Sequence, residues 1–127
     1  MAEPILYHGD EIEVYRDETT WNAKKVLRIV KRQWRWLLFV IELKVDNPNA
    51  PSFVGIFIDE AEEPIIEIPV SATEYELFDK SIDTVSWGIG THLIEVKLRS
   101  DGGGIYNRLF EVYTILPPSV GSVVKTS

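Results

Sequence analysis

Apolar and polar residues alternate along most of the chain. Between residues 91 and 100, apolar or aromatic side chains from His92 to Leu98 alternate with side chains that are mostly charged. In the segment 53–58, three β-branched residues fall on one side of an extended chain, with two phenylalanines and a glycine on the other. A period of two is that of a β-strand with one buried face. These segments, and the similar ones at 11–16, 65–70 and 74–78, are therefore predicted to be strands.

The most apolar segment, 35–45, is open to two interpretations. Its residues Leu37, Phe39, Ile41, Leu43 and Val45 share one side of an extended chain, which predicts a strand. A buried helix is the alternative, because periodicity does not separate the two for a short apolar run.

Turn-forming residues separate the predicted strands. The breaks are DNPNAPS at 46–52, DEAEEP at 59–64, SWGIG at 86–90 and SDGGG at 100–104. No segment combines the apolar period and the caps of an amphipathic helix. The pattern predicts an all-β fold, an antiparallel β-sandwich of jelly-roll or immunoglobulin-like type with about eight or nine strands. We expect one domain over residues 1–116 and a C-terminal tail over 117–127, which begins with two prolines.

The glycine-rich segment at 100–104 is predicted to be a hairpin turn. A phosphate-binding glycine loop needs a helix after it, whereas residues 105–116 are rich in β-branched and aromatic residues and predict a strand. A calcium loop needs several spaced oxygen ligands, and Asp101 stands nearly alone. The glycines supply the positive φ angles that other residues resist.

Composition and net charge narrow the function classes. The 127 residues contain no cysteine, which excludes disulfides, zinc–thiolate sites and thiol nucleophiles. The N-terminus lacks a basic flank and a long apolar run, and the apolar run 36–41 is too short to span a bilayer. We therefore expect a soluble chain with no signal peptide and no membrane partner. The net charge of −7 disfavours nonspecific binding to nucleic acid.

The charged residues are segregated along the chain. Between Trp21 and Trp36 there is no acid, and the cations are Lys24, Lys25, Arg28, Lys31, Arg32 and Arg35. From Asp59 to Asp83 acids predominate, opposed by Lys80 alone. One interpretation is that these segments are solvated faces of strands and loops. The other is that they are complementary patches that meet between subunits or bind a charged partner.

No constellation of catalytic residues is recognisable. His8 lies beside a turn glycine and His92 on the apolar face of a strand, where a histidine satisfied at the core or rim is expected. No nucleophile-elbow spacing and no His-x-x-x-His pair is present. The clustered acids of the 59–63 loop, Asp59, Glu60, Glu62 and Glu63, could hold a surface cation, but adjacent acids on a loop are usually only solvated. We therefore predict no enzyme, no cofactor and no tight metal site.

Aromatic side chains are the feature of the sequence that points to the binding of a ligand or partner. Four tryptophans are many for this length, and Trp34 and Trp36 would share one face of a strand. Exposed, the pair would form a platform for a sugar ring, a base or an apolar partner; facing inward, it would be core. The candidate residues for binding a ligand or partner are Trp21, Trp34, Trp36, Trp87 and Tyr106. The candidate charged interface is the set of six cations between Trp21 and Trp36.

Most of the chain, from about Glu11 to Thr114, resembles small jelly-roll or immunoglobulin-like accessory modules. The matching pieces are GIFIDE at 55–60, SATEYELFDKSI at 71–82, SWGIGTHLIEVKL at 86–98 and YNRLFEVYT at 106–114. Such modules recur in virion and tail proteins of archaeal viruses and phages, and in carbohydrate-binding appendages. The resemblance implies a non-enzymatic structural or recognition role, located in the virion or host cytoplasm if the protein is viral. It carries over no catalytic or ligand-binding residue.

Two function classes follow. The first is a structural or protein-interaction module, such as a virion-associated one, whose partner is a second copy or another protein and whose contact includes the segment Lys24–Arg35. The second is a carbohydrate-binding module that uses exposed Trp and Tyr side chains. Nucleic-acid binding through Lys24–Arg35 is a disfavoured third class.

Overall fold

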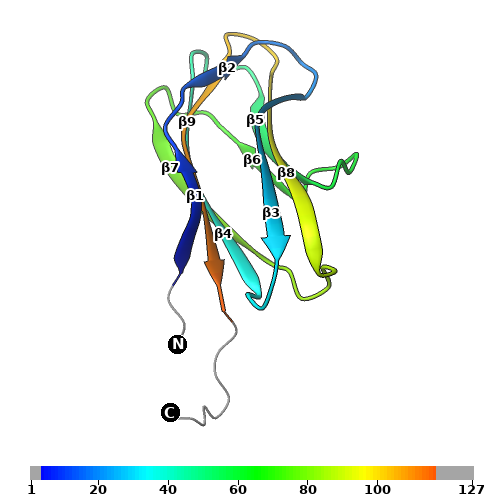
Figure 1. Ribbon diagram of the computed structural model, residues 1–127. Coiled ribbons are helices and arrows are strands. Elements are labelled where there is room, and N and C mark those ends of the chain that lie inside the picture. The colour runs from blue at the N-terminus through cyan, green and yellow to red at the C-terminus, as the bar shows by residue number, and fades with distance from the viewer. Residues whose placement is uncertain (1–3, 117–127) are drawn as a thin grey trace.

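A computed structural model describes residues 4–116, which form two antiparallel sheets packed face to face (Figure 1). The all-β prediction is confirmed. The strands are β1 (Ile5–Asp10), β2 (Val14–Arg16), β3 (Asn22–Lys31), β4 (Trp36–Val45), β5 (Ser52–Ile58), β6 (Ile66–Pro69), β7 (Glu76–Asp83), β8 (Gly90–Ser100) and β9 (Ile105–Ile115). The expected tail at 117–127 lies outside the described residues. Within residues 4–116 there is no helix with the length and apolarity to cross a membrane.

The strand order is that of a jelly roll. One sheet runs β1-β9-β4-β7, with β2 also pairing along β9, and the other runs β3-β8-β5-β6. Four antiparallel pairs are nested in sequence: β1 with β9, β3 with β8, β4 with β7, and β5 with β6. The four nested pairs form one long antiparallel ribbon. When this ribbon folds into two sheets, β4 also pairs with β9 and β5 also pairs with β8. Of the two predicted topologies, the jelly roll is therefore the correct one.

Strand β4 shows how the period-two pattern builds the core. The buried-helix alternative for 35–45 is wrong, because Trp36–Val45 is extended and buried residues alternate with half-buried ones along it. Its inward side chains Leu37, Phe39, Ile41, Leu43 and Val45 are at most 1% exposed. They join apolar side chains of both sheets in one cluster, and this burial holds the sheets together.

The glycine-rich segment at 100–104 is a tight turn, but the prediction of a hairpin is wrong. It joins β8 to β9, and these strands belong to opposite sheets. The chain therefore crosses the sandwich, a feature that strand periodicity does not report. Gly103 and Gly104 have φ angles of 83° and 93°, which glycine adopts without strain. A Cβ at Gly104 would lie 2.2 Å from the Tyr15 ring, so the glycine also admits that ring close to the backbone.

Candidate functional site

Trp34 and Trp36 do not form the shared platform that the sequence allowed. Trp34 precedes β4, is 6% exposed and packs in the core cluster. Trp36 begins β4 and is half-buried, and the Arg35 guanidinium stacks over its ring at 4.8 Å. The regular strand starts only at Trp36, so the period-two argument does not reach back to Trp34. Trp34 has the core role that was the alternative.

The six cations between Trp21 and Trp36 do not form one interface. Lys25 and Lys31 are 9% and 7% exposed, and their ammonium groups donate to the backbone carbonyls of Arg108 and Trp34. Arg35 is paired with Asp83 at 2.9 Å. Within residues 4–116 the ion pairs include none for the other three cations, Lys24, Arg28 and Arg32. Three of the six predicted interface cations, Lys25, Lys31 and Arg35, are therefore engaged in contacts within the protein itself.

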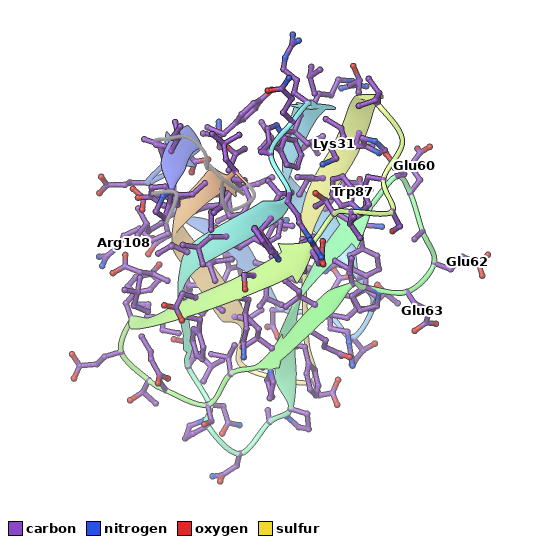
Figure 2. All side chains as sticks on the ribbon, turned by 90° about the horizontal axis from the view of Figure 1, so that it is seen from below. Lys31, Glu60, Glu62, Glu63, Trp87 and Arg108 are labelled. Carbon is purple, nitrogen blue, oxygen red and sulfur yellow. The ribbon has the colours of Figure 1, made fainter. Side chains whose placement is uncertain are left out.

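The acidic loop between β5 and β6 does not gather its side chains around a cation. Figure 2 shows Glu60, Glu62 and Glu63 spread along the outside of this loop. Among the residues that the structure describes, no group of three or more His, Asp or Glu is placed to hold a metal ion.

His92 ties this loop to the turn before β8. Its Nδ1 lies 2.6 Å from the Asp59 carboxylate, and its Nε2 lies 2.7 Å from the carbonyl oxygen of Gly88. The hydrogen bond to Gly88 and then that to Asp59 raise the pKa of His92. The half-buried Trp87 ring lies 4.8 Å from His92 and meets Trp34 edge-on at 6.3 Å. Trp87 and His92 thus brace one end of the sandwich.

Three tyrosines meet on the outer face of the five-stranded sheet. Strand pairing places Tyr15 opposite Tyr106, and Tyr106 opposite Lys44. Tyr75, which immediately precedes β7, completes the row, because the Lys44 ammonium lies 5.0 Å from its ring centroid and 4.9 Å from that of Tyr106. The Arg108 guanidinium covers Tyr75 at 4.2 Å. We call Tyr15, Tyr75, Tyr106, Lys44 and Arg108 the tyrosine surface.

Hydrogen bonds fix two of these rings. The Tyr75 hydroxyl donates to Glu13 at 2.5 Å, and that of Tyr106 donates to Asp46 at 2.9 Å. Burial, together with the hydrogen bond to Glu13, raises the pKa of Tyr75. The hydrogen bond to Asp46, followed by burial, raises the pKa of Tyr106. Both hydroxyls therefore keep their protons at neutral pH.

The tyrosine surface also presents paired polar groups. Arg108 forms an ion pair with Glu42 at 2.9 Å, and Figure 2 shows Arg108 at the outside of the molecule. Tyr15 is 42% exposed and lies 4.7 Å from the Tyr106 ring, at a tilt of 48°. The cation–ring contacts within residues 4–116 include none over Tyr15. Its ring is the accessible one of the three.

A second aromatic group lies on the outer face of the four-stranded sheet. Trp21 precedes β3, and its ring reaches across β8 to β5, where it meets Phe57 edge-on at 5.3 Å. A Cβ at Gly55 would lie 3.0 Å from the Trp21 ring and 2.7 Å from that of Phe57, so glycine is needed beneath them. Phe57 is consequently only 1% exposed, although it belongs to the outer face.

Two cations cover these rings. The Arg99 guanidinium lies 4.9 Å from the Trp21 centroid and 4.2 Å from that of Phe53. The Lys97 ammonium lies 4.4 Å from the Phe57 centroid. We call Trp21, Phe53, Phe57, Lys97 and Arg99 the tryptophan surface. Cation–π contacts of this kind hold both the rings and the charged groups in place.

The candidate residues from the sequence are thus divided among several places. Tyr106 lies in the tyrosine surface and Trp21 in the tryptophan surface, while Trp34, Trp36 and Trp87 lie elsewhere. The other members of both surfaces were missed. Each missed residue on a strand occupies an outward position of the period-two pattern. The pattern could therefore have identified these residues as candidates for the outer faces of the sheets. Which outward positions meet depends on strand pairing, which the pattern does not report.

Comparison with known proteins supports the fold. No protein-family model and no curated protein matches the chain. Among solved structures, the C-terminal domain of EclA, a sugar-binding protein, is 9% identical, with a TM-score of 0.56 over 80% of this chain and 77% of that one. The CBM36-1 domain of a multidomain xylanase from the hindgut metagenome of Trinervitermes trinervoides is 11% identical, with a TM-score of 0.51 over 89% and 96%.

A larger enzyme contains a similar domain. The family GH115 4-O-methyl-α-glucuronidase BtGH115A is 12% identical, with a TM-score of 0.52 over 89% of this chain. The chain spans only 16% of that enzyme. These likenesses show a shared β-sandwich fold and do not bear on the viral part of the resemblance.

Proposed function

We propose that the protein is a carbohydrate-binding domain that binds neutral sugar rings at the tyrosine surface. The observation that carries this proposal is the row formed by Tyr15, Tyr106, Lys44 and Tyr75 across neighbouring strands. A sugar-binding protein and a CBM36-1 domain among the similar folds support the same class of function.

The chemistry of the row suits a sugar. A pyranose ring has an apolar face of C–H groups that packs on an aromatic ring, and hydroxyls that need donors and acceptors around it. Tyr15 supplies an accessible ring, and Glu42 with Arg108 supplies a carboxylate and a guanidinium nearby. Because the Tyr75 and Tyr106 rings are already fixed by hydrogen bonds, little side-chain entropy is lost on binding. The mixture of both charge signs favours an uncharged ligand.

Replacing Tyr15 by alanine tests this proposal. We expect binding to the best ligand from an array of neutral glycans to weaken at least about tenfold, as for a buried aromatic anchor. Isothermal titration calorimetry measures the change. Tyr113→Ala is the matched control, since Tyr113 lies on the same sheet in β9 and its hydroxyl bonds to Glu111. Failure of the wild-type protein to bind any neutral glycan, or an equal loss in the two variants, would contradict the proposal.

A protein-interaction role is the second candidate. It is favoured by exposed apolar side chains on both edges of the five-stranded sheet: Ile5 and Leu6 of β1 are 59% and 53% exposed, and Leu77 of β7 is 59% exposed. For this role we expect the sedimentation coefficient to rise with protein concentration and Leu77→Lys to abolish the rise. A monomer at every concentration contradicts self-association.

A further inference from the structure

We propose that the tryptophan surface is a second binding site, which takes an anionic polysaccharide whose sugar rings carry carboxylates. It lies on the outer face of the opposite sheet from the tyrosine surface and does not depend on the function proposed for that surface. Its ligand differs in charge, and so does the physical origin of its affinity.

The first argument is the distribution of charge. The chain has a net charge of −7, yet the outer face of the four-stranded sheet carries an excess of cations. Its charged residues at outward ladder positions of β3, β8 and β6 are Arg28, Lys97 and Arg99 against Glu67 and Glu95. A cationic face on an acidic protein attracts polyanions locally, while the net charge repels them elsewhere.

The second argument is that two of these three cations have no ion-pair partner among the described residues. Arg99 pairs with Glu67 at 3.1 Å, but the ion pairs within residues 4–116 include none for Arg28 or Lys97. The Arg99–Glu67 pair shows that a carboxylate fits against this face. Lys97 and Arg99 are held over aromatic rings, so their positions are set before a ligand arrives.

The third argument is the shape of the surface. At one end Phe53 also lines a hollow of about 370 Å³ between the β4–β5 loop and the end of β6, beside Pro51 and Pro69. Arg28 lies on the same outer face, opposite Leu93 of β8, in the direction away from this hollow. A chain molecule can therefore contact the hollow, the stacked cations and Arg28 in succession.

A single-stranded nucleic acid is the other polyanion to consider, and the rings argue against it. Base stacking needs open aromatic faces. Phe57 is 1% exposed, and Arg99 lies over both Trp21 and Phe53. A ligand on this surface meets the charged groups of Lys97 and Arg99, which cover the aromatic rings beneath them. Carboxylates can pair with these cations, whereas bases would find no open ring on which to stack.

The experiment compares two double variants that remove the same charge. Arg28→Gln with Lys97→Gln removes two cations of the outer face that carries the tryptophan surface, and Arg32→Gln with Lys80→Gln removes two exposed cations outside that face. Binding to polygalacturonate is measured over about 50 to 200 mM salt, with dextran as the neutral polymer and oligothymidylate as the nucleic acid. We expect the first pair to lower the slope of log K against log salt by about two, and the control pair to leave it unchanged.

Each other outcome overturns the proposal. Equal losses of polygalacturonate affinity in the two double variants would mean that the polymer is attracted by cations anywhere on the protein and not by a specific site. Tighter binding to oligothymidylate than to polygalacturonate would make this a nucleic-acid surface. Absence of polygalacturonate binding by the wild-type protein, or equal binding of dextran, would remove the site. Tyr15→Ala should not change polygalacturonate binding, so failure of this proposal is distinguishable from failure of the tyrosine surface.

Discussion

Replacing Phe39 by alanine is expected to lower the free energy of unfolding by about 3–5 kcal/mol. Phe39 lies in the middle of β4, is fully buried, and stacks on Phe110 of β9 with ring centroids 6.3 Å apart and planes within 9°. Its removal leaves a cavity between two sheets whose hydrogen-bonded ladders prevent them from closing around it. Because domains are stable by only about 5–15 kcal/mol, such a loss is a large share of the total.

Urea unfolding followed by tryptophan fluorescence measures this loss as a lower midpoint at constant slope. Leu77→Ala is the control, because Leu77 lies in β7 of the same sheet but is 59% exposed, and we expect a change within about 0.5 kcal/mol. Similar losses in the two variants would show that Phe39 does not have the central core role assigned to it.

Replacing Asp10 by alanine is expected to cost about 3 kcal/mol of stability, because it orphans a buried ammonium. The Lys25 Nζ lies 2.5 Å from the Asp10 carboxylate and 2.8 Å from the Arg108 carbonyl oxygen, and the Lys25 side chain is only 7% exposed. Without Asp10, the carbonyl alone faces the charge. Adding Lys25→Met to Asp10→Ala removes that charge and should recover much of the loss.

The same pair predicts a pH dependence. Burial by itself raises the pKa of Asp10, but hydrogen bonds from Lys25, the amide of Ile12 and His8 outweigh it, so the pKa lies below its ordinary value. A carboxylate whose pKa is lower in the folded state stabilises the fold fully above its unfolded pKa of about 3.9. That contribution is lost as the pH falls through the folded pKa. The stability gap between wild type and Asp10→Ala should therefore shrink below about pH 4.

An exposed ion pair provides the matched control. Asp83 pairs with Arg35 at 2.9 Å, but both side chains are 41% exposed and solvent screens the pair, so Asp83→Ala should lower stability much less than Asp10→Ala does. Urea unfolding at several pH values measures both variants. Equal costs for Asp10→Ala and Asp83→Ala, or a gap for Asp10→Ala that grows in acid, would contradict the role given to the Lys25–Asp10 pair.

Local pattern was sufficient for the strands and for much of the core. The alternation in β4 correctly assigned Phe39 and its neighbours to the inner face, because a period of two needs only the pleat of one strand. The glycines at 103 and 104 were also correctly linked to positive φ, which is a property of the residue itself. The polar side of the same pattern placed Lys97 and Arg99 outward on β8.

The candidate sites were decided by tertiary structure. Tyr15, Tyr106 and Lys44 are far apart in sequence, and they form one row only because β2, β9 and β4 pair in a particular register. Trp21 reaches Phe57 only because β8 lies between their strands and β5 has a glycine at the contact. These choices depend on the free energy of the whole sandwich, in which many pairings compete, whereas periodicity describes one strand at a time.

The same reason explains the residues that the sequence left open or misplaced. Alternation left open whether Trp34 and Trp36 face outward or into the core; the strand begins only at Trp36, and the ring of Trp34 packs in the core cluster. Lys25 and Lys31 look like members of a basic patch, but they lie on the inner side of β3, where their ammonium groups reach backbone carbonyls. The sequence by itself determined which segments are extended and which faces are apolar. Only the packing of the two sheets decided which polar and aromatic side chains meet, because that depends on contacts between distant strands.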